Sequence, residues 1–183
     1  SIVIPTWNNL PYLQLCVEGI RSNSSLKNQI VVLVNEGNDG TEQWLQQQAD
    51  IDYVLAPTNI GICYGLNACR RVLKSEYFLY MNDDMYPLPK WDEALMNQIL
   101  SLDTKMFMLS ATMIEPHDTG NPCVIVKDYG HDLDTLRKEE LLKDFNDFEK
   151  DDWSGSSWPP NVVHIDLWDL VGGYSTEFSP GMY

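Results

Sequence analysis

Short apolar segments alternate with helix-like segments through the first 81 residues of the chain. Strands are expected over residues 1–5, 30–34, 53–55 and 77–81. Between the first two, Leu13, Cys16 and Ile20 recur at the spacing of one helical face. Strands that alternate with helices at this interval favour right-handed crossovers and a mainly parallel sheet. The pattern therefore predicts an α/β fold whose first half is a nucleotide-binding type of unit.

Helix boundaries and the looser second half are also predicted from local signals. Thr41 is expected to cap a helix through residue 48, and Asn59 a helix over 61–73. The later elements are expected to be a helix opened by Pro89, strands over 107–114 and 123–126, an amphipathic helix over 133–148 and a loop over 151–160. At 183 residues the chain is long enough for one substantial core, so a single domain is expected.

The composition limits the partners that the chain can have. Twelve basic and 27 acidic side chains give a net charge of -15 at pH 7. This charge disfavours binding to nucleic acid or to an anionic membrane, although a local basic patch would escape the average. A neutral acceptor or an anion bridged by a metal is easier to accommodate.

Four cysteines and the hydropathy pattern bear on the compartment. Cys16, Cys63, Cys69 and Cys123 show no metal-ligand spacing, so buried free thiols in a reducing cytoplasm are expected. No apolar run is long enough to cross a bilayer, which leaves peripheral contact with the inner face of the membrane as an alternative.

Two adjacent carboxylates, Asp83 and Asp84, follow the last strand of the first half directly. In a parallel sheet, residues 6–8, 35–37 and 82–84 all emerge at one edge, because each follows a strand. An aromatic ring, a carboxylate that can accept from a base or sugar hydroxyl, and two hard oxygen ligands describe a site for a nucleoside diphosphate with Mg²⁺ or Mn²⁺. The alternative is local, since Asn-Asp-Asp is also good turn chemistry.

Several ordered blocks resemble the family 2 glycosyltransferases, which have the GT-A fold. The matching blocks are IVIPTWNN, VNEGNDGTEQWL, NIGICYGLN and YMNDDMYPLPKWDEAL, and later VHIDLWDLVGGYSTEFSPGMY. The resemblance covers nearly the whole chain. It implies a single GT-A domain over residues 1–183, with a donor nucleotide-binding half at 1–86 and an acceptor-side half at 87–183.

The resemblance implies transfer of a sugar from a nucleotide sugar, expected to be a UDP-sugar, to a hydroxyl of a saccharide or glycolipid with inversion. Asp84 would hold Mn²⁺ or Mg²⁺ against the diphosphate, while Asn82 and Asp83 would orient the ribose and the water shell of the metal. The physical need is clear, because a departing nucleoside diphosphate develops negative charge that a bound cation neutralises.

Further donor-side residues are implied by the matching blocks. They are Pro5, Thr6, Trp7, Glu36, Asn59, Gly61 and Asn67. Trp7 would stack on the base and Glu36 would accept a hydrogen bond from uracil. Structural alternatives stay open: a core position for Trp7, a solvated turn carboxylate for Glu36, and an N-cap, a close-packing glycine and a helical amide in the block at 59–67.

On the acceptor side, Trp158 and His164 are the candidates, since an aromatic platform can stack on a sugar ring. The alternatives are a loop that covers a sheet edge and a structural histidine. In the family, the catalytic base lies in an acidic motif after the VGGY-type segment. The chain ends at Tyr183 and begins at Ser1 without Met. It is therefore expected to be a C-terminally incomplete piece of a longer protein, with the base beyond Tyr183.

Two rival functions remain at this stage. A nucleotidyltransferase that makes nucleotide sugars shares the α/β framework, but PTWNN stands where a glycine-rich phosphate loop would follow the first strand. A non-catalytic module that binds carbohydrate or nucleotide is the other. The identity of the sugar, the acceptor and the oligomeric state cannot be predicted from these residues, because specificity depends on single groups in a pocket.

Overall fold

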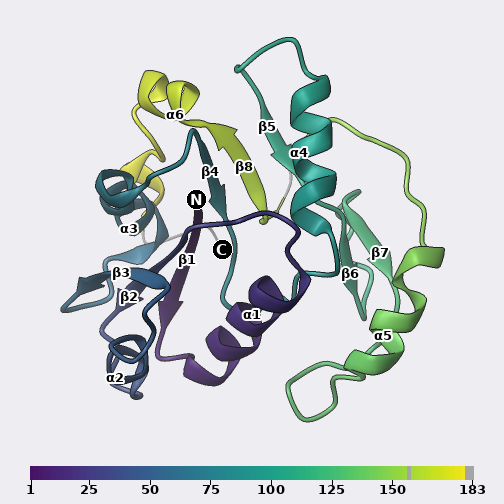
Figure 1. Cartoon of the computed structure of the whole chain (residues 1–183), viewed down its shortest axis with the longest axis horizontal. Helices are drawn as coiled ribbons and strands as arrows, with labels where there is room; N and C mark the ends of the chain where they lie inside the picture. The colour runs from purple at the N-terminus through teal and green to yellow at the C-terminus, as the bar shows by residue number, and fades with distance from the viewer. Residues whose placement is uncertain (156–157, 180–183) are drawn as a thin grey trace.

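A six-stranded sheet lies at the centre of this computed structural model, which describes residues 1–155 and 158–179. Its strands are β1 (Ile2–Trp7), β2 (Ile30–Asn35), β3 (Ile51–Ala56), β4 (Tyr77–Tyr80), β5 (Met108–Ser110) and β8 (Asn161–His164). Their spatial order is β3-β2-β1-β4-β8-β5 (Figure 1). The pairs among β1 to β4 are parallel, whereas β8 is antiparallel to both β4 and β5. The prediction of an α/β fold with a mainly parallel sheet is confirmed.

Helices cover both faces of this sheet. They are α1 (Leu10–Asn23), α2 (Thr41–Leu45), α3 (Gly61–Cys69), α4 (Trp91–Ser101) and α6 (Ile165–Val171). Residues of α1, α2 and α4 join one core cluster, and residues of α3 and α6 join the other. Successive residues of β1 divide between the clusters, with Ile2 and Ile4 in the first and Val3 in the second. Strand β2 is apolar from Ile30 to Val34 because both of its faces are covered.

A smaller parallel pair lies beside the main sheet, next to α5 (Lys138–Asp144) (Figure 1). Its strands are β6 (Met113–Glu115) and β7 (Val124–Val126). The prediction of one strand over 107–114 is therefore wrong, because the chain changes partner between β5 and β6. Ala111 N still donates to the Pro160 carbonyl beside β8, whereas Met113 N donates to the Cys123 carbonyl beside β7.

The predicted helix over 133–148 is also wrong in its first part, since α5 begins only at Lys138 and a 3₁₀ turn, Phe145–Asp147, follows it. Side chains compete for the backbone before that point: Thr135 N donates to Asp132 Oδ1 at 2.9 Å, and His131 N donates to Thr135 Oγ1 at 3.0 Å. Strand β8 was not predicted.

Three boundaries in the first half differ in detail from the predictions. Helix α2 ends at Leu45, and its first turn is capped by Asp39, whose Oδ1 accepts from Thr41 N. Helix α3 ends at Cys69 and continues as a 3₁₀ turn, Arg70–Val72. The N-cap of α3 is Ile60 and not Asn59, whose Oδ1 accepts from Gly61 N at 2.9 Å in a turn just before the helix.

Other expectations can be compared directly. All four cysteines are buried and free, as predicted. None of the helices in the described part of the chain has the length and apolarity that a membrane span requires. Two short stretches lie outside the described residues. They are residues 156–157 of the expected loop and residues 180–183 at the end of the block VHIDLWDLVGGYSTEFSPGMY. A last 3₁₀ turn, Thr176–Phe178, is described before them.

Gly65 tests the packing of α3 on the sheet. A Cβ atom at this position would lie 1.9 Å from Leu33 Cδ2, and Leu33 is fully buried in β2. We expect Gly65→Ala to lower the free energy of unfolding by about 1–3 kcal/mol, because the core has no room to move aside. Urea denaturation measures this, with Tyr64→Ala at an exposed position of α3 as the control. Wild-type stability in Gly65→Ala would show that the helix is packed more loosely.

Candidate functional site

The ends of β1, β2 and β4 bring polar residues to one edge of the sheet. Trp7 and Asn35 are paired at the ends of β1 and β2. Strand β4 ends at Tyr80, opposite Val3, so residues 82–84 pass beside the last residues of β1. The predicted convergence of the three segments is present in this structure, and it places the candidate site outside the carboxyl ends of the parallel strands.

Trp7 and Glu36 meet at this edge through a hydrogen bond. Trp7 Nε1 donates to Glu36 Oε2 at 2.8 Å, and Asn8 Nδ2 donates to the same oxygen at 3.2 Å. The Trp7 side chain is 58% exposed, so the alternative of a core tryptophan is wrong. The indole is fixed by its edge while part of the side chain faces solvent, which leaves surface for stacking.

Glu36 has one carboxylate oxygen to spare. Both donors use Oε2, and Oε1 makes no hydrogen bond with any residue that the structure describes. The backbone is unusual here, with φ of 66° at Glu36 and 49° at Asn8, and Asn38 N donates to Asn8 Oδ1 at 2.8 Å. These hydrogen bonds join the loop after β1 to the loop after β2. Glu36 Oε1 is therefore a fixed acceptor for an N–H donor.

The acidic loop differs at each of its three residues. Asn82 Oδ1 accepts from the Tyr80 hydroxyl at 2.6 Å. Burial raises the pKa of the Asp83 carboxyl, and the charge of Asp84 raises it further, while the side chains of Thr6 and Asn9 lower it. Asp84 is exposed and makes no hydrogen bond or ion pair within the described chain. Asp84 is thus the carboxylate of this loop that is most available to a ligand.

Thr6 lies beneath this loop at the end of β1. Its hydroxyl is buried and forms no hydrogen bond of normal geometry within residues 1–155 and 158–179, although it is close enough to Asp83 to lower the pKa of that carboxyl. Buried polar atoms usually have partners, so an orphaned hydroxyl next to a carboxylate marks a place where a bound group would complete the hydrogen bonding.

Glu115 is a further acidic residue at the site, which the sequence did not indicate. Burial raises the pKa of the Glu115 carboxyl, and so does the charge of Asp84, while His117 lowers it. Met113, on the same face of β6, belongs to a small core cluster against which Met85 packs. The β6–β7 pair therefore directs a third carboxyl toward the acidic loop, and this depends on a strand pairing that has no local signal.

The block at 59–67 contains residues with structural roles. Asn59 Oδ1 accepts from Gly61 N just before α3, and Gly61 has a φ of 74°, which favours glycine. The Asn67 amide uses both of its polar ends on one backbone: Nδ2 donates to the Tyr174 carbonyl at 2.8 Å, and Oδ1 accepts from Tyr174 N at 2.9 Å. Ile60 N donates to Asn35 Oδ1, which ties the start of α3 to the end of β2. Through these contacts, the block holds the edge of the site in place.

The two acceptor candidates lie toward opposite ends of the β4–β8 strand pair. Strand β8 begins opposite Tyr80, so Trp158, which shortly precedes it, lies toward the acidic edge and is 44% exposed. His164 pairs with Tyr77 at the other end of β4 and is only 2% exposed. Its Nδ1 accepts from Asp166 N and caps α6. The structural alternative thus accounts for His164, and the structure does not bring it to the site.

The sequence of the chain matches the model of one protein family. The model of glycosyl transferase family 2 matches residues 1–149. The chain belongs to this family. A search of curated proteins finds no match.

Solved structures of glycosyltransferases share the GT-A fold of the chain. One is the mannosyltransferase PcManGT from Pyrobaculum calidifontis in complex with GDP-Man and Mn²⁺, with a TM-score of 0.65 and 18% identity over 98% of this chain and 48% of that one. Another is S. aureus TarS 1–349 in complex with UDP, with a TM-score of 0.66 and 13% identity over 97% of this chain and 50% of that one. The same protein with UDP-GlcNAc gives a TM-score of 0.60 and 15% identity over 94% of this chain and 47% of that one. The chain spans about half the length of these structures.

A divalent metal, as in the mannosyltransferase complex with Mn²⁺, fits the residues present here. No three acidic, histidine or cysteine side chains form a metal cluster within the described residues. Asp84 would supply a carboxylate, with phosphate oxygens and water as the other ligands, which is the usual environment of Mg²⁺. Burial raises the pKa values of Asp83 and Glu115, and the charge of Asp84 raises them further, so a cation beside these carboxyls would favour their ionised forms.

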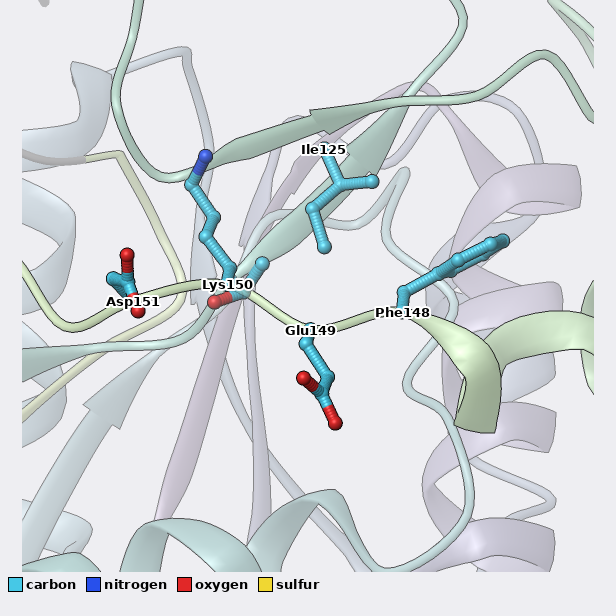
Figure 2. A pocket seen from close by; sticks show the side chains of 6 residues that line it. Ile125, Phe148, Glu149, Lys150 and Asp151 are labelled. Atoms are coloured by element: carbon cyan, nitrogen blue, oxygen red, sulfur yellow. The ribbon is translucent and has the colours of Figure 1, made fainter.

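A cavity of about 580 Å³ lies elsewhere in this family 2 domain. Its lining is formed by Thr112, Ile125, Phe148, Glu149, Lys150 and Asp151 (Figure 2). Val124 packs on the side of β7 that faces Met85, so the neighbouring Ile125 points to the opposite side. The cavity is therefore separate from the acidic loop, and no donor-side candidate lines it.

Asp83 gives the site a pH-dependent cost in stability. Its raised folded-state pKa means that stability is lost as pH rises through that pKa, because the ionised carboxylate is partly buried. We expect Asp83→Asn to melt at a higher temperature than the wild type at pH 7. The difference should disappear below about pH 4, near the ordinary pKa of Asp. Calorimetric melts at both pH values test this, with the exposed Asp103→Asn as the control; an equal or lower melting temperature at pH 7 would contradict it.

Proposed function

We propose that this chain is the donor-binding part of a glycosyltransferase that moves a sugar from a UDP-sugar to a hydroxyl of a saccharide or glycolipid, with inversion. The observation that carries the proposal is the convergence of Trp7, Glu36 and Asp84 at one edge of the sheet. Membership of glycosyl transferase family 2 supports it, because the three residues stand in the matching blocks at the expected strand ends.

The nucleoside would bind between the ends of β1 and β2. Trp7 offers an exposed aromatic side chain, fixed through its indole nitrogen, on which a base can stack. Glu36 Oε1 would accept a hydrogen bond from N3–H of uracil. Pro5 and Thr6 shape the floor of this region as buried residues of β1. The Trp7 ring would stack on the base, and Glu36 Oε1 would favour a base that has an N–H at its edge over one that lacks it.

The diphosphate would lie against residues 82–84. Asp84 would hold Mn²⁺ or Mg²⁺, and the bound cation would neutralise the charge that develops on the departing nucleoside diphosphate. The need for a cation is strong here, because the chain has a net charge of -15 and Glu115 adds to the negative field of the loop. Thr6, Asn82 and Asp83 would orient the ribose and the water molecules around the ion.

The acceptor would approach from the side of Trp158, which lies toward the same edge. Its ring would stack on a sugar, a contact that tolerates many saccharides. We assign no catalytic base to any of the described residues. A cytoplasmic location, where nucleotide sugars are available, is part of the same proposal.

Metal-dependent nucleotide binding tests this function directly. We expect calorimetry in Mn²⁺ to show binding of UDP in preference to GDP, CDP and dTDP, and a chelator to abolish it. Asp84→Ala should weaken UDP binding in Mn²⁺ at least tenfold, because the carboxylate that holds the cation is lost. Asp103→Ala, which removes an exposed acid on the loop before β5, is the matched control. Absence of binding to all four nucleotides would reject the proposal, and equal binding with chelator would reject the metal.

The base preference should depend on Glu36. We expect Glu36→Ala to weaken UDP binding about fivefold to tenfold and to reduce the preference for UDP over CDP, because one hydrogen bond to uracil is lost and cytosine has no N3–H to donate. Metal dependence should be unchanged, since Glu36 follows β2 and Asp84 follows β4. If the nucleotide preference is the same in Glu36→Ala and the wild type, then Glu36 does not read the base.

A further inference from the structure

Tyr80 and Asn82 form a pair that the role of the acidic loop does not explain. Tyr80 is the last residue of β4 and is 7% exposed, and its hydroxyl donates to Asn82 Oδ1 at 2.6 Å. Burial raises the pKa of Tyr80, with the charges of Tyr174, Asp84 and Asp83 adding to the effect. The hydroxyl therefore stays protonated and remains a donor at any physiological pH.

This hydrogen bond decides which end of the Asn82 amide is left for a ligand. The oxygen is occupied by Tyr80, and Nδ2 makes no hydrogen bond to any part of the chain that the structure describes. Asn82 is only partly buried, so Nδ2 is open to a ligand. An aspartate at the same place would present acceptor oxygens alone, whereas this asparagine presents a donor.

Tyr80 is itself held in place from the acceptor side. Its ring meets the Tyr174 ring edge-on, with centroids 6.3 Å apart and an interplanar angle of 81°. Trp168 of α6 packs on the same Tyr174 ring at 5.2 Å. The two hydrogen bonds from Asn67 fix the Tyr174 backbone. The hydroxyl of Tyr80 therefore has a fixed position relative to the acidic loop.

Gly173 shows that this support is tightly fitted. Its φ is 81°, and a Cβ atom at this position would lie 2.3 Å from Asn67 Oδ1. Only a glycine lets the chain pass so close to the amide of α3. The contacts from Asn67 through Tyr174 to Tyr80 thus join the segment after α6 to the loop that carries Asp84.

We propose that Tyr80 is a positioning residue that turns the Asn82 amide so that Nδ2 donates a hydrogen bond to an oxygen of the bound nucleoside diphosphate. The proposal rests on the nucleotide-binding function given above and adds a role for Asn82 as a donor. The oxygen belongs either to the ribose or to the diphosphate. Both accept hydrogen bonds, and both would lie beside the first residue of the acidic loop.

A double-mutant cycle tests whether Tyr80 acts through Asn82. The affinity for UDP in Mn²⁺ is measured by calorimetry for Tyr80→Phe, Asn82→Ala and the double variant. We expect each single variant to bind about threefold to tenfold more weakly, as for the loss of one hydrogen bond, and the double variant to bind no more weakly than Asn82→Ala. Multiplicative effects of the two substitutions would overturn the proposal, since a merely structural Tyr80 would act independently of Asn82.

The matched control is Tyr77→Phe in the same strand, at the opposite end of β4 from the acidic loop. It should bind UDP as the wild type does. If the wild type binds no nucleotide, the proposed function fails; if it binds UDP and the two substitutions act independently, only the present inference fails. Melting temperatures of the variants separate a change of affinity from a loss of fold.

Asn82→Asp separates a donor from a metal ligand. If Asn82 donates to the nucleotide, then Asp at this position weakens UDP binding in Mn²⁺, because an acceptor faces an oxygen. If UDP binds more tightly in Mn²⁺, the position serves the metal and the proposal is overturned. Uridine in place of UDP identifies the oxygen: a loss of affinity in Asn82→Ala for uridine as well as UDP indicates the ribose, and a loss for UDP alone indicates the diphosphate. No loss for either ligand also overturns the proposal.

Discussion

The parallel pairing of β1 with β2 and with β4 is the constraint on which the rest of the structure depends. It requires that the chain return across the sheet after each strand, which places α1 on one face and α3 on the other. It also requires that the three strands end at the same edge. The core therefore uses most apolar positions of these strands, with Trp7 left exposed at the end of β1, and the residues that follow the strands meet at one edge, where Trp7 and Asn8 donate to Glu36.

The acidic groups at this edge destabilise the free domain but favour a bound cation. Burial raises the pKa values of Asp83 and Glu115, and the charge of Asp84 raises them further; burial likewise raises the thiol pKa of Cys16 beneath the loop, with the charges of Asp83 and Asp84 adding to the effect. Each of these shifts means that negative charge at this edge is unfavourable in the free protein. A cation that arrives with a diphosphate would relieve this cost, so the same carboxylates that weaken the fold favour the ligand.

The sequence was informative where structure is local and uninformative where it depends on partners far along the chain. Buried strands and the shared edge of the sheet were predicted, because periodicity and strand order suffice for them. The split between β5 and β6 and the antiparallel β8 could not be predicted, because they depend on which distant segment supplies each partner. For that reason His164 was misplaced and Glu115 was missed: one belongs to β8 and the other to β6.

The block at 59–67 illustrates how a family motif can serve binding without touching the ligand. Three of its residues each meet a backbone requirement: Asn59 accepts from Gly61 N, Gly61 adopts a left-handed φ, and Asn67 makes two hydrogen bonds to the Tyr174 backbone. The Arg70 guanidinium likewise forms a two-point ion pair with Asp169 of α6. Helix α3 thus contacts the end of β2 at one terminus and the segment around α6 along its length. If the donor occupies the edge formed by β1, β2 and β4, then any shift of α3 would alter the donor and acceptor sides together, because the same helix is hydrogen-bonded to both.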